Sequence, residues 1–505
     1  MILARLRRAK LLAGEDPHDP GHLDTHPLVR EYFGEQLRSQ RTDAWKECNR
    51  RLFHYYRTLA PQLPESFGEM EPLFLAVICG CNAGLYREAL NEVYLPRIQR
   101  GNASFAANVL GARAALLTVL VHFFEHGCWG SPVETAVEGQ SLTAEDQLFI
   151  LLQAGRYLTA TRGFGAPEAC VCYERAELLC HSLNRPRLLS VALVGQWHYS
   201  LITDTVTATL QIAKRTYSLA QEQNDARLLM GAYRVLAGTL FYLGDFESAR
   251  QYAMRAAQIW RSGSVQSHPE DLDTPVVGCL CYQAKSEWHL GEVASSKAII
   301  AEAISVARKL NDMHTLASAL YSAAILSYYE LKFADVERLA SDLMELSTRH
   351  NFVYWLAWGV VFRGWARSAS GETAEGIPGI EQGIKDLRAT GLTLDTPSLL
   401  ALKAEALHLT DRTSEALEAI REAEAMAERS EERFWCAELH RLRGVFLAAT
   451  DAEDMQIEAS FREAIRIAKE QKSVSLEKRA EATYAEYRRQ KASAPGAKGF
   501  RLPLW

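Results

Sequence analysis

Apolar residues recur along most of the chain at positions i, i+3, i+4 and i+7, with polar residues between them. This spacing places the apolar side chains on one face of an α-helix, and the strict alternation of a half-buried β-strand is almost absent. The pattern therefore predicts an all-α protein.

Short turns of a common form separate these helical segments. Gly244, Gly291 and Gly371 are each followed by a charged residue, and a small residue stands five positions after each glycine. Glycine permits the tight backbone that joins two antiparallel helices, and a small residue lets the second helix cross the first closely. The turns indicate helical hairpins.

The small position repeats at a regular interval. Successive copies lie 40 residues apart, except for one interval of 47, which an insertion at 268–275 explains, and a last interval of 41. With further small residues twelve before and seven after it, the pattern resembles the tetratricopeptide repeat, whose usual period is about 34 residues. The longer period implies longer helices. The series is Ala169, Thr209, Ala249, Ser296, Val336, Gly376, Ala416 and Ile457.

The resemblance implies a tetratricopeptide-like helical-hairpin superhelix over residues 143–490, in which stacked hairpins share one core and enclose a concave surface. We expect one further hairpin around 84–89, a single long helix over 103–126 and a loop over 127–141. In tetratricopeptide proteins the first helix of each hairpin lines the concave groove, at fixed positions relative to the small residue of that helix. Aromatic residues and arginine, which carry much of the binding energy at interfaces, are frequent at these positions here. The predicted partner-binding groove consists of His198, Arg234, Phe241, Lys285, Trp288, Tyr321, Tyr328, Trp358 and Trp365. The alternative is that these side chains pack between neighbouring hairpins.

The segment 23–33 reads Leu-Asp-Thr-His-Pro-Leu-Val-Arg-Glu-Tyr-Phe. It resembles the end of the winged-helix subdomain in STAND-type signalling ATPases, the class of NB-ARC and NACHT proteins. The C-terminal repeats also resemble those of bacterial ATPase–repeat proteins, some of which carry nucleotide-cyclase domains. The resemblance implies a winged-helix remnant at 1–60, with His26 at the family's nucleotide-sensing position. Leu28, Val29, Tyr32 and Phe33 should then pack on an apolar helix face.

Other features argue against a working nucleotide site. No Gly-x-x-x-x-Gly-Lys-Ser/Thr loop occurs in the chain, so we expect the nucleotide-binding domain to be absent and His26 to be vestigial or simply a capping histidine. Pro27 also replaces the aspartate that usually follows this histidine. We expect residues 61–142 to form a helical arm or linker and 491–505 to be a flexible tail.

The candidate chemistry is sparse. No catalytic motif is present, and we predict neither a catalytic residue nor a cofactor. Three Cys-x-Cys pairs, at 79/81, 170/172 and 279/281, place their thiols on different helix faces, which favours buried core residues over a metal site. Metal-capable side chains cluster near the N-terminus, but without rigid spacing they are typical of a solvated loop. They are Asp16, His18, Asp19, His22, Asp24 and His26.

Composition and net charge limit the classes of partner that the chain is expected to bind. The net charge of −6 and pI of about 6.2 do not suggest a nucleic-acid binder, and no apolar run is long enough to span a membrane. Because no secretory signal precedes the repeats, we expect a cytoplasmic protein. Two functions remain: a non-catalytic scaffold that binds a protein, a peptide or a small anionic effector as the sensor half of a signalling switch, or a regulatory fragment that acts with a separately encoded STAND ATPase or nucleotide cyclase.

Overall fold

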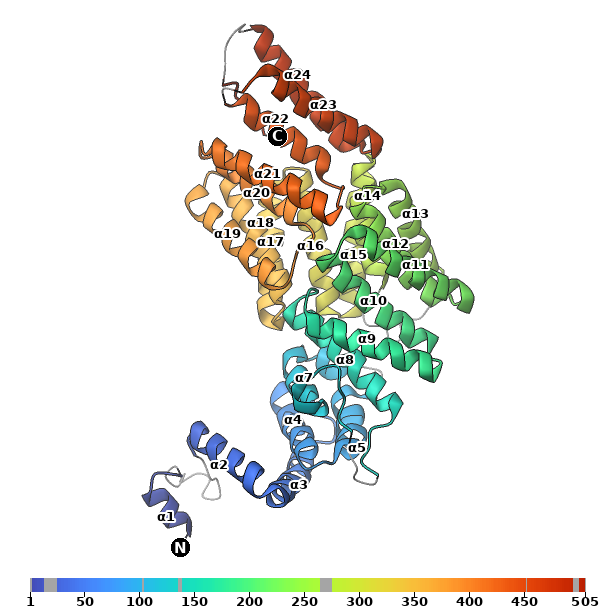
Figure 1. The fold of residues 1–505 in the computed structure, drawn as a ribbon, viewed down its shortest axis with the longest axis vertical. Helices are drawn as coiled ribbons and strands as arrows, with labels where there is room; N and C mark the ends of the chain where they lie inside the picture. Colours follow the sequence, from blue (N-terminus) through green and yellow to red (C-terminus); the bar gives the residue numbers. More distant parts are fainter. Residues whose placement is uncertain are drawn as a thin grey trace. The chain divides into compact units, whose positions relative to one another are not determined.

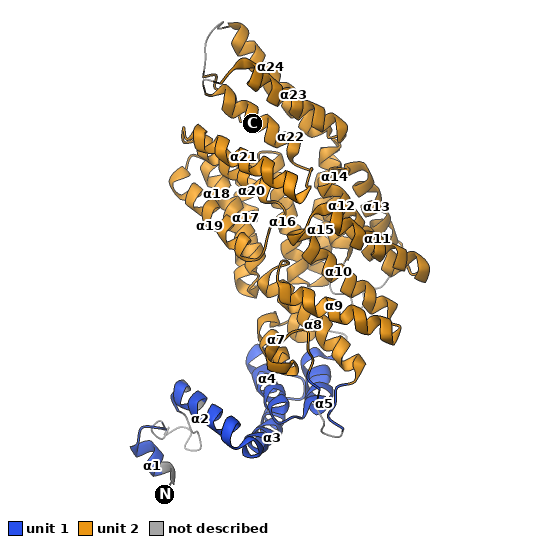
Figure 2. Cartoon of the chain, in the orientation of Figure 1, with its two compact units in different colours: residues 1–101, 133–142 blue, residues 102–132, 143–505 orange. Residues whose placement is uncertain are grey.

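The computed structural model describes residues 2–12, 25–101, 104–134, 139–263, 275–450, 452–493 and 499–504. Within these ranges the only β-structure is an isolated bridge between Phe124 and Pro132, so the all-α prediction is confirmed. The chain forms two compact units, residues 1–101 with 133–142 and residues 102–132 with 143–505 (Figure 2). The boundary predicted at residue 60 falls inside the first unit.

The first unit is helical and is held together by a buried arginine. Arg97 donates hydrogen bonds to the carbonyl oxygens of Arg57 (2.7 Å), Ala60 (3.1 Å) and Pro61 (2.8 Å). These oxygens lie at the carboxyl end of α3, where a helix leaves carbonyl groups without helical partners. The elements are α1 (Ile2–Arg8), α2 (Pro27–Gln40), α3 (Thr42–Leu59), α4 (Phe67–Asn82), α5 (Tyr86–Glu88) and a π-helical segment (Ala89–Gln99).

Helix α2 begins at Pro27, as the sequence predicts, and His26 caps it. The His26 Nδ1 atom accepts a hydrogen bond from the backbone N–H of Leu28 at 3.3 Å, which agrees with the capping interpretation. The expected burial of the apolar face is wrong, because Leu28, Tyr32 and Phe33 remain 67%, 60% and 52% exposed. Helix α3 is the main helical neighbour of α2, and one neighbour covers only one side of a helix.

The second unit opens with short helices in place of the single helix predicted at 103–126. They are α6 (Phe105–Asn108) and α7 (Arg113–Leu120), followed by 3₁₀ turns at Val121–Phe123 and Glu125–Gly127. The break falls at Gly111, whose φ of +65° is unfavourable for any residue with a side chain. A Cβ atom there would also lie 2.4 Å from Nδ1 of His350, so the close approach of His350 requires glycine.

The rest of the second unit is a series of antiparallel helical hairpins (Figure 1). All eight positions of the predicted series lie in second helices and are buried, which confirms the repeat. Residues 268–274 of the predicted insertion lie outside the described residues, and Pro275 is the first residue of the next described helix. The hairpins are α8 (Ala144–Arg162) with α9 (Pro167–Leu183), α10 (Pro186–Thr203) with α11 (Val206–Gln223), α12 (Ala226–Tyr242) with α13 (Phe246–Arg261), α14 (Pro275–His289) with α15 (Val293–Leu310), α16 (Met313–Tyr329) with α17 (Phe333–His350), α18 (Val353–Ala369) with α19 (Thr373–Ala389), α20 (Thr396–His408) with α21 (Thr413–Ser430), and α22 (Cys436–Ala448) with α23 (Asp454–Glu470); α24 (Val474–Ser493) follows.

The superhelix is wound so tightly that its successive turns touch. The backbone N–H of Thr393, before α20, donates to the Ile202 carbonyl of α10 at 3.0 Å, and that of Arg433, before α22, donates to Tyr242 of α12 at 2.7 Å. The Ser475 hydroxyl of α24 donates in the same way to Trp288 of α14. Each contact joins first helices five hairpins apart, so direct hydrogen bonds connect one turn to the next.

The carboxyl-terminal segment packs on this superhelix. The backbone N–H of Phe500 donates to the Ala448 carbonyl at 2.7 Å, and Leu502 and Leu504 are buried. The expectation of a flexible tail is therefore wrong for residues 499–504, because their apolar side chains cover the end of the core.

Candidate functional site

The predicted groove residues lie on the first helices of five consecutive hairpins, as expected, but they do not line an open groove. Seven of the nine predicted positions are buried, with exposures from 1% to 6%, and His198 and Arg234 are half-buried. The prediction of an exposed aromatic groove is wrong, and the alternative of packing inside the repeat array holds. The buried residues are Phe241, Lys285, Trp288, Tyr321, Tyr328, Trp358 and Trp365.

The tight winding explains this burial. Aromatic side chains on or next to first helices that are three to five hairpins apart fill the space between those helices. The Trp435 ring stacks on Tyr329 at 4.6 Å between centroids, and Phe434 lies 5.3 Å from Phe241, although these partners are more than 100 residues apart in the chain. Close packing of this kind leaves the interior without room for an extended peptide.

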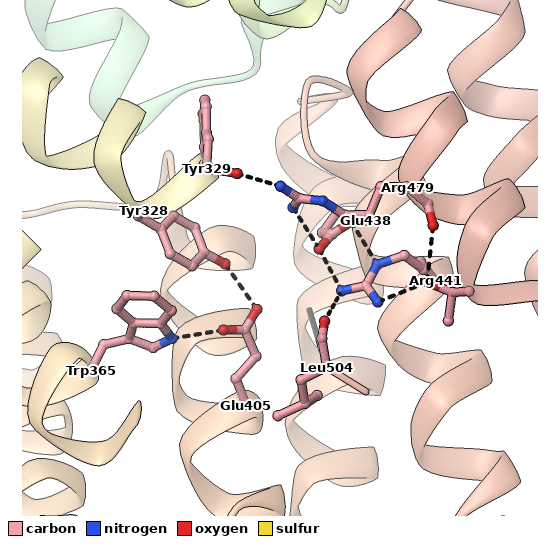
Figure 3. A network of polar contacts seen from close by, with 9 residues as sticks. Tyr328, Tyr329, Trp365, Glu405, Glu438, Arg441, Arg479 and Leu504 are labelled. Atoms are coloured by element: carbon pink, nitrogen blue, oxygen red, sulfur yellow. Dashed lines mark hydrogen bonds and ion pairs between the residues drawn. The ribbon is translucent and has the colours of Figure 1, made fainter. Parts of the chain in front are cut away.

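A buried glutamate connects the predicted aromatic residues to α20 (Figure 3). The Glu405 carboxylate accepts hydrogen bonds from the Tyr328 hydroxyl at 3.1 Å and from Trp365 Nε1 at 2.7 Å. Burial raises the pKa of Glu405 to about 7, and the nearby charge of Glu438 adds to this effect. The group therefore titrates near neutral pH inside the core.

A second acid in the same network remains charged (Figure 3). Burial alone would raise the pKa of Glu438, but Arg441 and Arg479 outweigh it and lower the pKa to about 2. The Arg441 guanidinium lies 2.8 Å from Glu438 and also donates to the Leu504 carbonyl at 2.8 Å. Arg479 lies 3.1 Å from Glu438 and donates to the Tyr329 carbonyl. These contacts bind the carboxyl-terminal segment, α22, α24 and α16 together.

A small polar cavity of about 70 Å³ lies further along the interior, and four residues of the predicted set line it: His198, Arg234, Lys285 and Tyr321. Lys285 Nζ lies 4.4 Å from the ring centroid of Tyr282, a cation–π distance. The neighbouring Asp395 accepts hydrogen bonds from the hydroxyls of Tyr242 at 3.0 Å and Tyr321 at 3.3 Å. Burial raises the pKa of Asp395 to about 6, and Lys285 opposes this shift. The cavity has room for a few water-sized groups.

The open grooves of the second unit lie instead on its outer surface. One, called here the α18 groove, has a volume of about 1020 Å³ and lies between the turn from α8 to α9 and helices α17–α19. Its apolar lining includes Met344, Val353, Leu356 and Val360. The three α18 residues stand at i, i+3 and i+7, so they form one stripe on the helix. Val353 is 37% exposed.

The sequence held a signal for this stripe that the groove prediction missed. Helix α18 is apolar on nearly every side, reading Val-Tyr-Trp-Leu-Ala-Trp-Gly-Val-Val-Phe from 353 to 362. A helix that is hydrophobic all round is normally buried on all sides. In α18 Trp358 and Trp365 face the core, and the opposite stripe faces the groove.

A second groove, of about 920 Å³, is lined mainly by charged side chains. It lies between the α12–α13 turn and helices α21–α23. Many of its charges are already paired, for example Lys472 with Glu247 at 2.6 Å and Arg466 with Glu463 at 2.7 Å. Such mixed, paired charge gives no preference for one ligand class.

The other side chains that could carry chemistry are the metal-capable groups and the cysteines. No group of three or more metal-capable side chains is assembled in the described part of the chain, and of the N-terminal cluster from Asp16 to His26 only His26 lies within that part. Five of the six paired cysteines, Cys79, Cys81, Cys172, Cys279 and Cys281, are buried as predicted for core thiols, whereas Cys170 is only half-buried. Within the described ranges no helix combines the length and apolar character that crossing a bilayer requires.

The chain shows limited similarity to known proteins. No protein-family model matches the chain. A stretch of 197 residues, 39% of the chain, is 27% identical to an uncharacterized protein of Rhizobium meliloti (strain 1021), and this match spans 19% of that protein's length. A Rap protein in complex with Competence and Sporulation Factor is 10% identical, with a TM-score of 0.47 over 69% of this chain and 99% of the other. A STAND protein with a tetratricopeptide repeat sensor from Pyrococcus horikoshii is 12% identical, with a TM-score of 0.40 over 88% and 72% of the two chains.

Proposed function

We propose that the chain is a non-catalytic helical-repeat scaffold that binds an amphipathic segment of a protein partner in the α18 groove. The observation that carries the proposal is the solvent-facing apolar stripe of Val353, Leu356 and Val360 in a groove of about 1020 Å³. Apolar grooves on helical scaffolds commonly receive the apolar face of a helix, through side chains spaced at i, i+3 or i+4, and i+7.

The charges around the groove favour an amphipathic partner over a purely apolar one. Arg162, Glu168, Asp386 and Arg388 line it together with the apolar stripe. Arg162 pairs with Glu168 at 2.6 Å, and Arg388 pairs with Glu422 at 2.9 Å. These side chains lie at the protein surface, so they can hydrogen-bond polar groups of a bound segment without first losing a buried partner. The expected ligand therefore has one apolar face and flanking charges of both signs.

The position of the groove suggests how binding acts as a sensor. One wall comes from Thr161 to Glu168 and the other from α17–α19 and Gly391. At the same seam Gly165 and Gly391 approach so closely that a Cβ atom on Gly165 would lie 2.4 Å from the Thr390 carbonyl. A segment bound in the groove contacts both superhelical turns, the one with the α8–α9 turn and the one with α17–α19. Its binding energy therefore favours one spacing between these two turns.

Peptide selection tests this function. Random 16-residue peptides displayed on phage are selected against the purified chain, and the best binder is labelled and titrated by fluorescence anisotropy. We expect binders with apolar residues at helical spacing, and we expect Leu356→Glu or Val360→Glu to weaken binding at least tenfold. Leu178→Glu, on the 60% exposed Leu178 of α9, is the matched control and should bind like the unmodified chain. Equal affinity in all variants would place the site elsewhere.

A second function, as the regulatory part of a switch with a separately encoded STAND ATPase or nucleotide cyclase, is favoured by one observation. Helix α2 exposes Leu28, Tyr32 and Phe33 at 52–67%, a surface suited to contact with another domain. In this role the isolated chain should not bind Mg-ATP in a calorimetric titration. Co-expression with a P-loop ATPase domain encoded by a neighbouring gene should give a complex that Tyr32→Glu disrupts, and separate elution of the two proteins would count against this function.

A further inference from the structure

A second, smaller cavity in the interior contains two arginines. It measures about 30 Å³ and is lined by Arg113 of α7, Arg156 of α8, His198 of α10, and Asp312 and His314 at the start of α16. On this measure one water-sized species needs about 10–15 Å³, so the cavity holds one or two small groups and excludes a peptide or a nucleotide.

Arg113 is almost completely buried, at 2% exposure, and only part of its guanidinium is paired. Its Nη2 atom donates to Asn108 Oδ1 at 3.0 Å and to Asp312 Oδ1 at 3.1 Å. Its Nη1 atom is buried and has no hydrogen-bond partner. A buried N–H donor without an acceptor costs about 1–3 kcal/mol, more when it carries charge, so an acceptor is expected there.

Arg156 brings a second positive charge to the same cavity at 9% exposure. Its Nη2 atom donates to the same Asn108 Oδ1 over a long 3.4 Å, and it forms no ion pair with a carboxylate of the described residues. Asp312 carries one negative charge and therefore cannot neutralise both arginines, and its oxygens also accept hydrogen bonds from the His314 backbone N–H at 3.1 Å and the Thr315 hydroxyl at 3.0 Å.

The cavity therefore holds two guanidinium groups and one carboxylate. Arginine cannot relieve the excess charge by losing a proton under ordinary conditions, and the two histidines that line the cavity can only add positive charge. An uncompensated charge in a desolvated interior is strongly unfavourable unless a counter-charge accompanies it.

We propose that Arg113 and Arg156 bind a small monovalent inorganic anion, of the size of chloride, in this cavity. The anion accepts hydrogen bonds from Arg113 Nη1 and from Arg156, and it neutralises the second guanidinium. Since the three charged residues come from α7, α8 and the α15–α16 loop, the bound anion ties the first hairpin of the repeat array to the fifth. This site is separate from the α18 groove and does not depend on the function proposed above.

The test uses the full chain in gluconate buffer at constant ionic strength, with chloride or bromide replacing gluconate in steps. We expect the thermal unfolding midpoint to rise saturably, by roughly 2 °C or more, as halide binds the folded state. Crystals soaked in bromide should show an anomalous peak beside Arg113 Nη1. Arg175→Gln, on the exposed outer side of α9, is the control and should respond to halide like the unmodified chain.

Arg156→Gln gives the decisive comparison, because it removes the excess charge and leaves the pair of Arg113 with Asp312 intact. This variant should be at least as stable as the unmodified chain without halide, and its midpoint should not change when halide is added. A saturable halide response that persists in Arg156→Gln, or the absence of any saturable response and of a bromide peak in the unmodified chain, would overturn the proposal.

Discussion

Replacing Glu405 by glutamine should change the pH dependence of stability in a way that can be worked out from the structure. The pKa of Glu405 is about 7 in the folded chain, against an ordinary glutamate value of 4.5. A carboxyl whose pKa is raised on folding binds more protons in the folded state, so it stabilises the fold at low pH. That contribution is lost as the pH rises from about 4.5 through about 7. The loss amounts to about 3 kcal/mol by pH 8.

Glutamine keeps the shape of Glu405 and removes this titration. Its oxygen can accept from Trp365 Nε1, and its amide can donate to the Tyr328 hydroxyl, although the tyrosine proton then loses its acceptor. We therefore expect Glu405→Gln to be about 1 kcal/mol less stable than the unmodified chain at pH 5 and about 2 kcal/mol more stable at pH 8.

The assay is urea unfolding followed by circular dichroism, at half-unit steps from pH 5 to 8.5. Other buried acids also titrate in this range, for example Asp395 with a pKa of about 6 and Glu432 with a pKa of about 8, but they are common to both proteins and cancel in the difference. Glu418→Gln, at an exposed position of α21, is the control and should show no such trend. A difference between Glu405→Gln and the unmodified chain that is constant with pH would refute the reasoning.

Four further substitutions test other parts of the fold. Arg441→Met leaves Glu438 buried with Arg479 as its remaining cationic partner, and it should lower the free energy of unfolding by about 3–5 kcal/mol in the same urea assay. Gly244→Ala should destabilise the chain by about 1–3 kcal/mol, because φ is +80° and the new Cβ would lie 2.5 Å from the Gln471 side chain of the next superhelical turn. Gly231→Ala, whose new Cβ would have no atom within 4 Å, should be neutral or stabilising by up to about 1 kcal/mol. His26→Ala should cost no more than about 1 kcal/mol in thermal unfolding, since His26 makes one exposed capping contact, and a loss of several kcal/mol would contradict that role.

The helices and the repeat could be predicted from the sequence because local rules govern them. Apolar spacing defines each helix, and the small residue that recurs from Ala169 to Ile457 marks where the second helix crosses the first. The apolar spacing and the small residue depend only on neighbours within about 40 residues. The chain therefore repeats the same local pattern eight times. The start of α2 at Pro27 followed in the same way from the preference of proline for the first helical turn.

Whether the groove side chains are exposed or buried depends on the rotation from one hairpin to the next, and the sequence of a single repeat does not specify this rotation. A small change in that rotation, added over five hairpins, decides whether first helices line an open groove or meet across a closed interior. Tyr328 and Trp365 occupy groove positions in the repeat, yet they contact Glu405 in the core, where the first helices of successive hairpins pack together. The pairing of Arg113 with Asp312, 199 residues away, likewise exists only once the turns are stacked. The sequence determined the hairpin, and long-range packing alone determined which of its faces water can reach.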